Sequence, residues 1–193
     1  FCLSRGLGDV YKRQFCHWLR NLTAFEAFNN VTTFSEKERI EAYNEEIALR
    51  FLMISTMPMS KIESIQNYRT ELKDFALQLA DPANETELNS YETLFKSAFE
   101  MMTAISSDIL HKWSPDSGKY NSKFSRTAFD AVACAFGYAI HNGRTLVDNP
   151  LEATQELWNE PNSISAYSTG VQTATRIQKV VPRGIAALTL SLI

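Results

Sequence analysis

The sequence predicts an all-α fold, a single irregular helical bundle, and three observations lead to it. Apolar residues recur at alternating spacings of three and four over long stretches, which is the period of a helix packed against neighbours. Alternation of apolar and polar residues never continues for more than a few positions, so exposed strands are not indicated. With 193 residues, of which 45% are hydrophobic and 21% charged, the chain is long enough for one soluble domain with its own core.

The element around which the rest is expected to pack is a helix from Ser35 to Met57. Ser35 and Glu38 have the spacing of a capping box, in which each side chain bonds the backbone N–H of the other. The later part of this stretch, IALRFLMI, is apolar almost all round, which is typical of a buried helix. It contains one charge, Arg50, which follows Glu46 by one turn. We expect Glu46 and Arg50 to form a structural ion pair, not a catalytic one.

Most of the remaining chain is predicted to be helical, with short connectors. Ser125 and Asn149 are candidate N-caps, and Asn142-Gly143 is a helix stop. The stretch HKWSPDSGKYNSK, residues 111–123, is interpreted as a polar loop. The predicted helices cover part of 15–28, 59–80, 85–110, 126–140, 150–159 and 171–181, with a short separate segment after Glu160-Pro161. The core is predicted to include Phe51, Ile54, Phe95, Met102, Phe129 and Phe136.

Both ends of the chain resemble translated sequencing adapter. Codons TAT AAG AGA CAG would encode residues 11–14, YKRQ, and their reverse complement encodes Leu-Ser-Leu-Ile, the last four residues. The stretch SRGLGDVYKRQ also matches a tagmentation-type adapter in one reading frame. We therefore expect residues 1–14 and 190–193 to be adapter-derived, and residues 15–189 to be a helical domain from a longer protein.

Composition excludes several classes of function. The formal net charge is −3, and it becomes more negative without residues 1–14, which hold three basic residues and one acidic one. Bulk charge therefore does not indicate a general nucleic-acid binder. Cys16 and Cys134 are interpreted as reduced thiols of a cytoplasmic protein. No apolar run is long enough to span a bilayer, so no membrane partner is expected.

The sequence offers no candidate catalytic residue, and neither a metal site nor a cofactor is expected in this part of the protein. His17, His111 and His141 share no spacing typical of metal ligands. No Ser, Cys or Thr stands in the context of an activated nucleophile. Gly6-Leu7-Gly8 lacks the strand, the further glycines and the helix of a phosphate loop.

Two groups of basic residues are the candidate nucleic-acid contacts. Arg176, Lys179 and Arg183 stand at roughly helical spacing in a stretch with few acids, and Lys119, Lys123 and Arg126 gather around the predicted loop. Phosphate contacts of this kind position a duplex without reading its sequence. Such groups are more often simply solvated, so a solvated face is the competing interpretation.

Three stretches resemble a known family: EAYNEEIALRFLM at 41–53, FSRTAFDA at 124–131 and TGVQTATRIQKVVPRG at 169–184. Their order and spacing are similar to the C-terminal helical part of a ParB-like bacterial family, domain of unknown function 262. This family includes the large subunit of GmrSD-type, modification-dependent restriction enzymes. Asn44 stands where the family's helix pattern has an acid.

The resemblance implies that any chemistry belongs to an N-terminal ParB-like domain with an Asp-Gly-Gln-Gln-Arg motif, linked to nucleotide use and DNA restriction. That motif is absent here, so no catalytic residue is carried over. The expected partners are that ParB-like domain and DNA. Two functions stay open: a non-catalytic helical domain of a GmrSD-like phage-defence protein that positions DNA or a partner domain, or a structural protein-interaction module without nucleic-acid contact.

Overall fold

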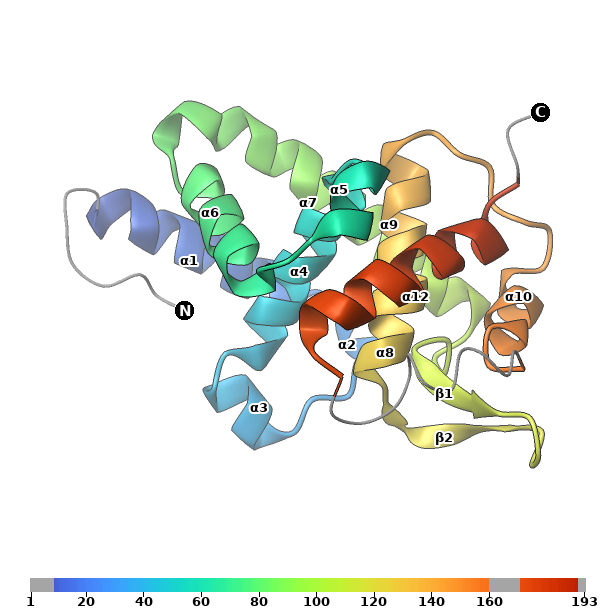
Figure 1. Cartoon of the computed structure of the whole chain (residues 1–193). Helices are drawn as coiled ribbons and strands as arrows, with labels where there is room; N and C mark the ends of the chain where they lie inside the picture. The colour runs from blue at the N-terminus through green and yellow to red at the C-terminus, as the bar shows by residue number, and fades with distance from the viewer. Residues whose placement is uncertain (1–8, 160–170, 191–193) are drawn as a thin grey trace.

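The computed structural model describes residues 9–159 and 171–190, and this part of the chain is mostly helical (Figure 1). A small two-stranded sheet corrects the all-α prediction. The elements are α1 (Asp9–Thr23), α2 (Glu26–Val31), α3 (Glu36–Ile40), α4 (Tyr43–Thr56), α5 (Met59–Ser64), α6 (Tyr68–Leu79), η1 (Pro82–Asn84), α7 (Glu85–Ile105), β1 (His111–Ser114), β2 (Lys119–Phe124), α8 (Arg126–Ala128), η2 (Phe129–Ala133), α9 (Cys134–His141), α10 (Pro150–Glu156) and α12 (Thr173–Leu188).

Helix α4 lies at the centre of the fold, where it packs against α1, α6, α7 and α9. The capping box predicted for its beginning forms, with the Ser35 hydroxyl accepting from the Glu38 N–H, but it starts α3 instead. The predicted single helix is therefore wrong in one respect, because it breaks at Ala42, whose φ is 55°. The break separates α3 from α4, and Ile40 at the end of α3 is 78% exposed.

Other predicted helices also have different limits, since α7 ends at Ile105 and α10 at Glu156, before the predicted ends at 110 and 159. The stretch 59–80 is divided into α5 and α6, and Asn67 starts the second by accepting a hydrogen bond from the Thr70 N–H. The last helix was expected to end at Val181, before a proline, yet α12 continues through Pro182 to Leu188. Proline inside a helix costs about 3 kcal/mol or more. We attribute the continuation to burial of Gly184, Ile185 and Leu188, which outweighs that cost.

The residues interpreted as a polar loop form an antiparallel β-hairpin. Trp113 lies opposite Tyr120, and their rings meet edge to face with centroids 4.9 Å apart. The chain reverses over a turn that ends at Gly118, whose φ of 62° suits glycine. The hairpin is anchored to the helices through Phe124, whose ring packs on Phe34 and Phe129. Figure 1 shows the hairpin beside α8 and α10.

The predicted helix at 126–140 forms as one continuous run, α8–η2–α9, whose middle, η2, is a π-helical turn. Ser125 caps its start, as predicted, and Gly143 follows its end with a φ of 60°. Helix α12 lies across this run (Figure 1) and comes so close that a Cβ on Gly184 would overlap the carbonyl oxygen of Ala131. The glycine therefore permits the close approach of α12 to η2.

The core confirms the six predicted residues. Phe51, Ile54, Phe95, Met102, Phe129 and Phe136 are all fully buried. The rings of Phe28, Phe51, Phe95 and Phe99 contact one another with centroids 4.5 to 5.6 Å apart. Aromatic pairs in such tilted and edge-to-face arrangements add to the free energy gained by burial. This cluster joins α2, α4 and α7.

Some predictions concern parts that the structure does not describe. Residues 1–8, 191–193 and the segment after Glu160-Pro161 lie outside the described residues. The backbone of residues 9–14 belongs to α1, whereas the side chains of Val10 and Tyr11 are not described. Leu190 is 49% exposed, and its N–H donates to the carbonyl oxygen of Thr145. In the described part, no helix combines the length and the apolar character needed to cross a bilayer.

Candidate functional site

The densest group of polar side chains is a buried network around Arg50 on α4. Its guanidinium is 3% exposed and donates in three directions, to the Tyr68 hydroxyl at 2.8 Å, to Glu46 at 2.8 Å and to Asp130 at 3.1 Å. The Tyr68 hydroxyl in turn donates to Glu46 at 2.9 Å. The ion pair of Glu46 and Arg50 thus belongs to a larger network of hydrogen bonds that also includes Tyr68 and Asp130.

Asp130 connects this network to α12. Its carboxylate is fully buried on the π-helical turn η2, and one oxygen accepts from Arg50. The other oxygen accepts from Nε of Arg176 at 2.7 Å. Two guanidinium groups and two carboxylates therefore share one site at which α4, α6, η2 and α12 meet. Such a site stabilises a fold only because each buried charge has a partner.

The electrostatics of the network hold its groups in fixed protonation states. Burial by itself lowers the pKa of Arg50, but the charges of Asp130 and Glu46, together with the hydrogen bond to Tyr68, raise it well above its ordinary value, so the guanidinium stays charged. Burial raises the pKa of the Tyr68 hydroxyl, which therefore stays protonated. Burial, followed by the charge of Asp130, raises the pKa of the Cys134 thiol well above its ordinary range. A thiol held neutral in this way is a poor nucleophile.

The three predicted basic residues of α12 differ in their surroundings. Arg176 belongs to the buried network, with a side chain only 13% exposed. Lys179 is exposed and makes no ion pair among the described residues. Arg183 is partly buried, and one terminal nitrogen of its guanidinium, NH1, has no hydrogen-bond partner in the described part of the chain. Of the three, Lys179 is therefore the one that α12 exposes, because the unpaired nitrogen of Arg183 is inaccessible to solvent and Asp130 neutralises Arg176.

Arg126 on α8 has partners within the fold, although its side chain is 56% exposed. Its guanidinium lies 4.2 Å from the centre of the Tyr43 ring and 3.7 Å from a carboxylate oxygen of Glu38. Hydrogen bonds from Ser35 lower the pKa of Glu38, with a smaller contribution from Arg126. Burial raises the pKa of Tyr43 to about 12. Arg126 therefore acts as a link between α8 and the α3–α4 turn.

Lys119 and Lys123 lie on β2, and both are exposed. They are four residues apart, and the pairing register shifts between them, because Tyr120 pairs with Trp113 and Phe124 pairs with His111. The Tyr120 hydroxyl lies 3.4 Å from the Thr154 hydroxyl of α10. Neither lysine makes an ion pair with a described residue. The structure therefore separates these lysines from Arg176 and presents them on the hairpin.

Sequence reasoning missed two members of the network, Asp130 and Tyr68. Asp130 carried a usable signal, since it is the only charge between Thr127 and Ile140, a stretch otherwise apolar or small. A charge in that setting needs a buried partner. Tyr68 carried no comparable signal, because its place in the apolar periodicity of its helix is that of an ordinary core residue. Among described residues, no group of three or more His, Cys, Asp or Glu is arranged to hold a metal.

Comparison with known proteins adds no relative. No protein-family model matches the chain, and searches of curated proteins and of solved structures also give no match.

Proposed function

We propose that this chain is a non-catalytic helical domain of a GmrSD-like restriction or phage-defence protein, and that it positions DNA for a ParB-like catalytic domain. The β1–β2 hairpin makes the DNA contact in this proposal. The buried network holds the helices that support the hairpin.

The arrangement of the three family-like stretches supports the first half of the proposal. Glu46 and Arg50 come from the first stretch, Asp130 from the second and Arg176 from the third. These residues, far apart in the sequence, form one hydrogen-bonded group. If the three stretches belong to one structural unit of a family, their residues are expected to contact one another in the fold.

The observation that carries the DNA contact is the exposed, unpaired state of Lys119 and Lys123 on a hairpin. Their ammonium groups have no carboxylate partner among the described residues, so a phosphate would not have to displace one. Asn121 and Ser122, also exposed on β2, supply further hydrogen-bonding groups. The chain as a whole is acidic, so attraction must be local and sensitive to salt.

The test is duplex binding by fluorescence anisotropy over a range of salt concentrations. With about two phosphate contacts, log affinity should fall against log salt with a slope near −2. The double variant Lys119→Gln, Lys123→Gln should flatten that slope and weaken binding to all duplex sequences alike.

Arg69 and Lys73 provide a matched control, because both are exposed on α6 and make no ion pair with a described residue. The double variant Arg69→Gln, Lys73→Gln removes the same charge from another surface. Equal losses of duplex affinity in both double variants would show that only the total charge of the protein matters, and would contradict a binding site on the hairpin. Absence of binding at low salt would favour the protein-interaction module, in line with the engagement of Arg126 and Arg176 within the fold.

A further inference from the structure

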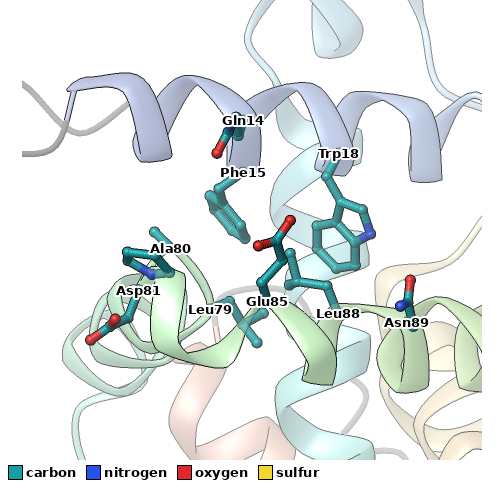
Figure 2. A pocket seen from close by; sticks show the side chains of 10 residues that line it. Gln14, Phe15, Trp18, Leu79, Ala80, Asp81, Glu85, Leu88 and Asn89 are labelled. Atoms are coloured by element: carbon teal, nitrogen blue, oxygen red, sulfur yellow. The ribbon is translucent and has the colours of Figure 1, made fainter.

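A second feature lies away from the hairpin, where α1 crosses the turn between α6 and α7. A cavity of about 350 Å³ opens there, and Figure 2 shows its lining. Phe15 and Trp18 project from α1, and Leu79, Glu85 and Leu88 come from the opposite side. A cavity of this size is at the lower end of those that hold small organic ligands.

One wall of this cavity is aromatic. The rings of Phe15 and Trp18 lie nearly parallel, at an angle of 29°, with centroids 5.8 Å apart. Figure 2 shows the Glu85 carboxylate directed toward α1, between these two rings. Aromatic faces next to a carboxylate are the surroundings in which organic cations are bound, because the ring quadrupole and the anion both attract positive charge.

The charges of the lining have one sign. Asp81 and Glu85 contribute carboxylates, and none of the lining residues is Lys, Arg or His. Asp81 is engaged, since its side chain accepts from the Ala83 N–H at 2.9 Å. Glu85 makes neither an ion pair nor a hydrogen bond with a described residue through its side chain. Its carboxylate is therefore available to a ligand.

We propose that this cavity binds a small organic cation, an ammonium or guanidinium compound. Glu85 pairs with the cation, and Phe15 and Trp18 cover it. Phe15, Trp18 and Glu85 all lie within residues 15–189, so the proposal does not depend on the nature of the N-terminal stretch. It is also independent of the DNA contact proposed for the hairpin.

The experiment follows the indole N–H signal of Trp18 by NMR during titration with choline, agmatine and 3,3-dimethylbutan-1-ol. The last compound has the shape of choline without its charge. The variant Trp18→Phe identifies the signal among those of Trp113 and Trp158. We expect saturable shifts with at least one cation, and affinity for 3,3-dimethylbutan-1-ol lower than for choline by about tenfold.

Glu85→Gln should weaken binding of the cation by about tenfold. Glu87→Gln is the matched control, because Glu87 is also an exposed acid in the first turn of α7 but does not line the cavity. Equal affinities for choline and its neutral analogue, or an unchanged affinity in Glu85→Gln, would overturn the proposal. Response to an arginine-rich peptide without response to choline or agmatine would also overturn it, in favour of a protein partner.

Discussion

Arg50 shows what a single buried charge requires. Its guanidinium has five N–H donors, and acceptors on Tyr68, Glu46 and Asp130 satisfy it from three directions. The Tyr68 ring also lies beneath it, 4.8 Å from the guanidinium carbon. Lysine could not replace this planar group, because its ammonium cannot reach partners in that arrangement.

Two tyrosines near the network provide a matched pair. Tyr68→Phe removes a hydroxyl that bonds both Arg50 and Glu46, so unfolding free energy should fall by about 1.5–3 kcal/mol. Tyr43→Phe removes a buried hydroxyl without a hydrogen-bond partner among the described residues, and should change stability by less than about 0.5 kcal/mol. Urea unfolding of both variants measures the difference. Equal losses would mean that the Tyr68 hydroxyl contributes nothing through its charged partners.

The raised pKa of Tyr43 predicts how the stability of the protein changes at alkaline pH. Its pKa is raised from 10.0 to about 12 by burial, so between these values the folded state keeps a proton that the unfolded state has lost. Its contribution to stability is complete below pH 10 and declines as pH rises toward 12. Relative to Tyr43→Phe, the parent should lose up to about 1.4 kcal/mol per pH unit in this window. Urea melts of both proteins at several alkaline pH values test this; parallel curves would contradict it.

At the scale of elements, close approach of α12 to the α8–η2–α9 run sets the geometry of the network. A Cβ at Gly184 would overlap the backbone carbonyl of Ala131, which cannot rotate away as a side chain can. Asp130 precedes Ala131, so a displaced α12 would also separate Asp130 from Arg176. The glycine and the ion pair therefore depend on one helix position.

Gly184→Ala should accordingly destabilise the protein more than Gly137→Ala. An alanine in place of Gly137 would bring its Cβ against the side chains of Ser55 and Phe51, which can adjust in part. Overpacking of this kind costs about 1–3 kcal/mol, and we expect Gly184→Ala at or above the upper limit. Thermal unfolding of both variants measures the order. The reverse order would show that α12 moves without cost.

The sequence predicts these elements unequally. Helices with a full 3-4 period, such as α7, and those with a capping signal, such as the one after Ser125, begin where expected, although α7 ends at Ile105 and not at the predicted limit of 110. The break at Ala42 has no local signal in the sequence; Tyr43, which directly follows it, packs edge to face on Phe34. The hairpin did have a local signal in the sequence, a proline and a glycine in the turn between Trp113 and Tyr120. Its strands, however, are too short for the alternation of apolar and polar residues to be recognised. The Asp130–Arg176 pair joins residues 46 positions apart, which no local pattern can indicate.

At the scale of the whole molecule, the aromatic cluster and the ionic network join α4 to different helices. Phe51 belongs to the first, with its ring centroid 5.1 Å from that of Phe99 and 5.6 Å from that of Phe95. Phe51→Ala should lower unfolding free energy by about 3–5 kcal/mol through the cavity it leaves. Denaturant melts measure this, and a loss below about 1 kcal/mol would mean that α4 is not central.

The ionic network makes a prediction that also separates its role from DNA binding. Asp130→Asn keeps the shape of the side chain but leaves Arg50 and Arg176 short of one negative charge, which should cost about 3–5 kcal/mol. Arg176→Gln should then cost less in the Asp130→Asn background than in the parent, with a coupling of about 0.5–3 kcal/mol in a double-mutant cycle. Additive losses would mean that the 2.7 Å contact contributes little.

The same Arg176→Gln variant decides where this arginine belongs. Its side chain is 13% exposed and already bonded to Asp130, so a phosphate would have to compete with a buried carboxylate. At a temperature where the variant remains folded, duplex affinity and its salt slope should match those of the parent, while Lys119→Gln, Lys123→Gln alters both. A folded Arg176→Gln variant with a flatter slope would return Arg176 to the DNA contacts expected from its spacing with Lys179 and Arg183. It would also require the network to open when the duplex binds.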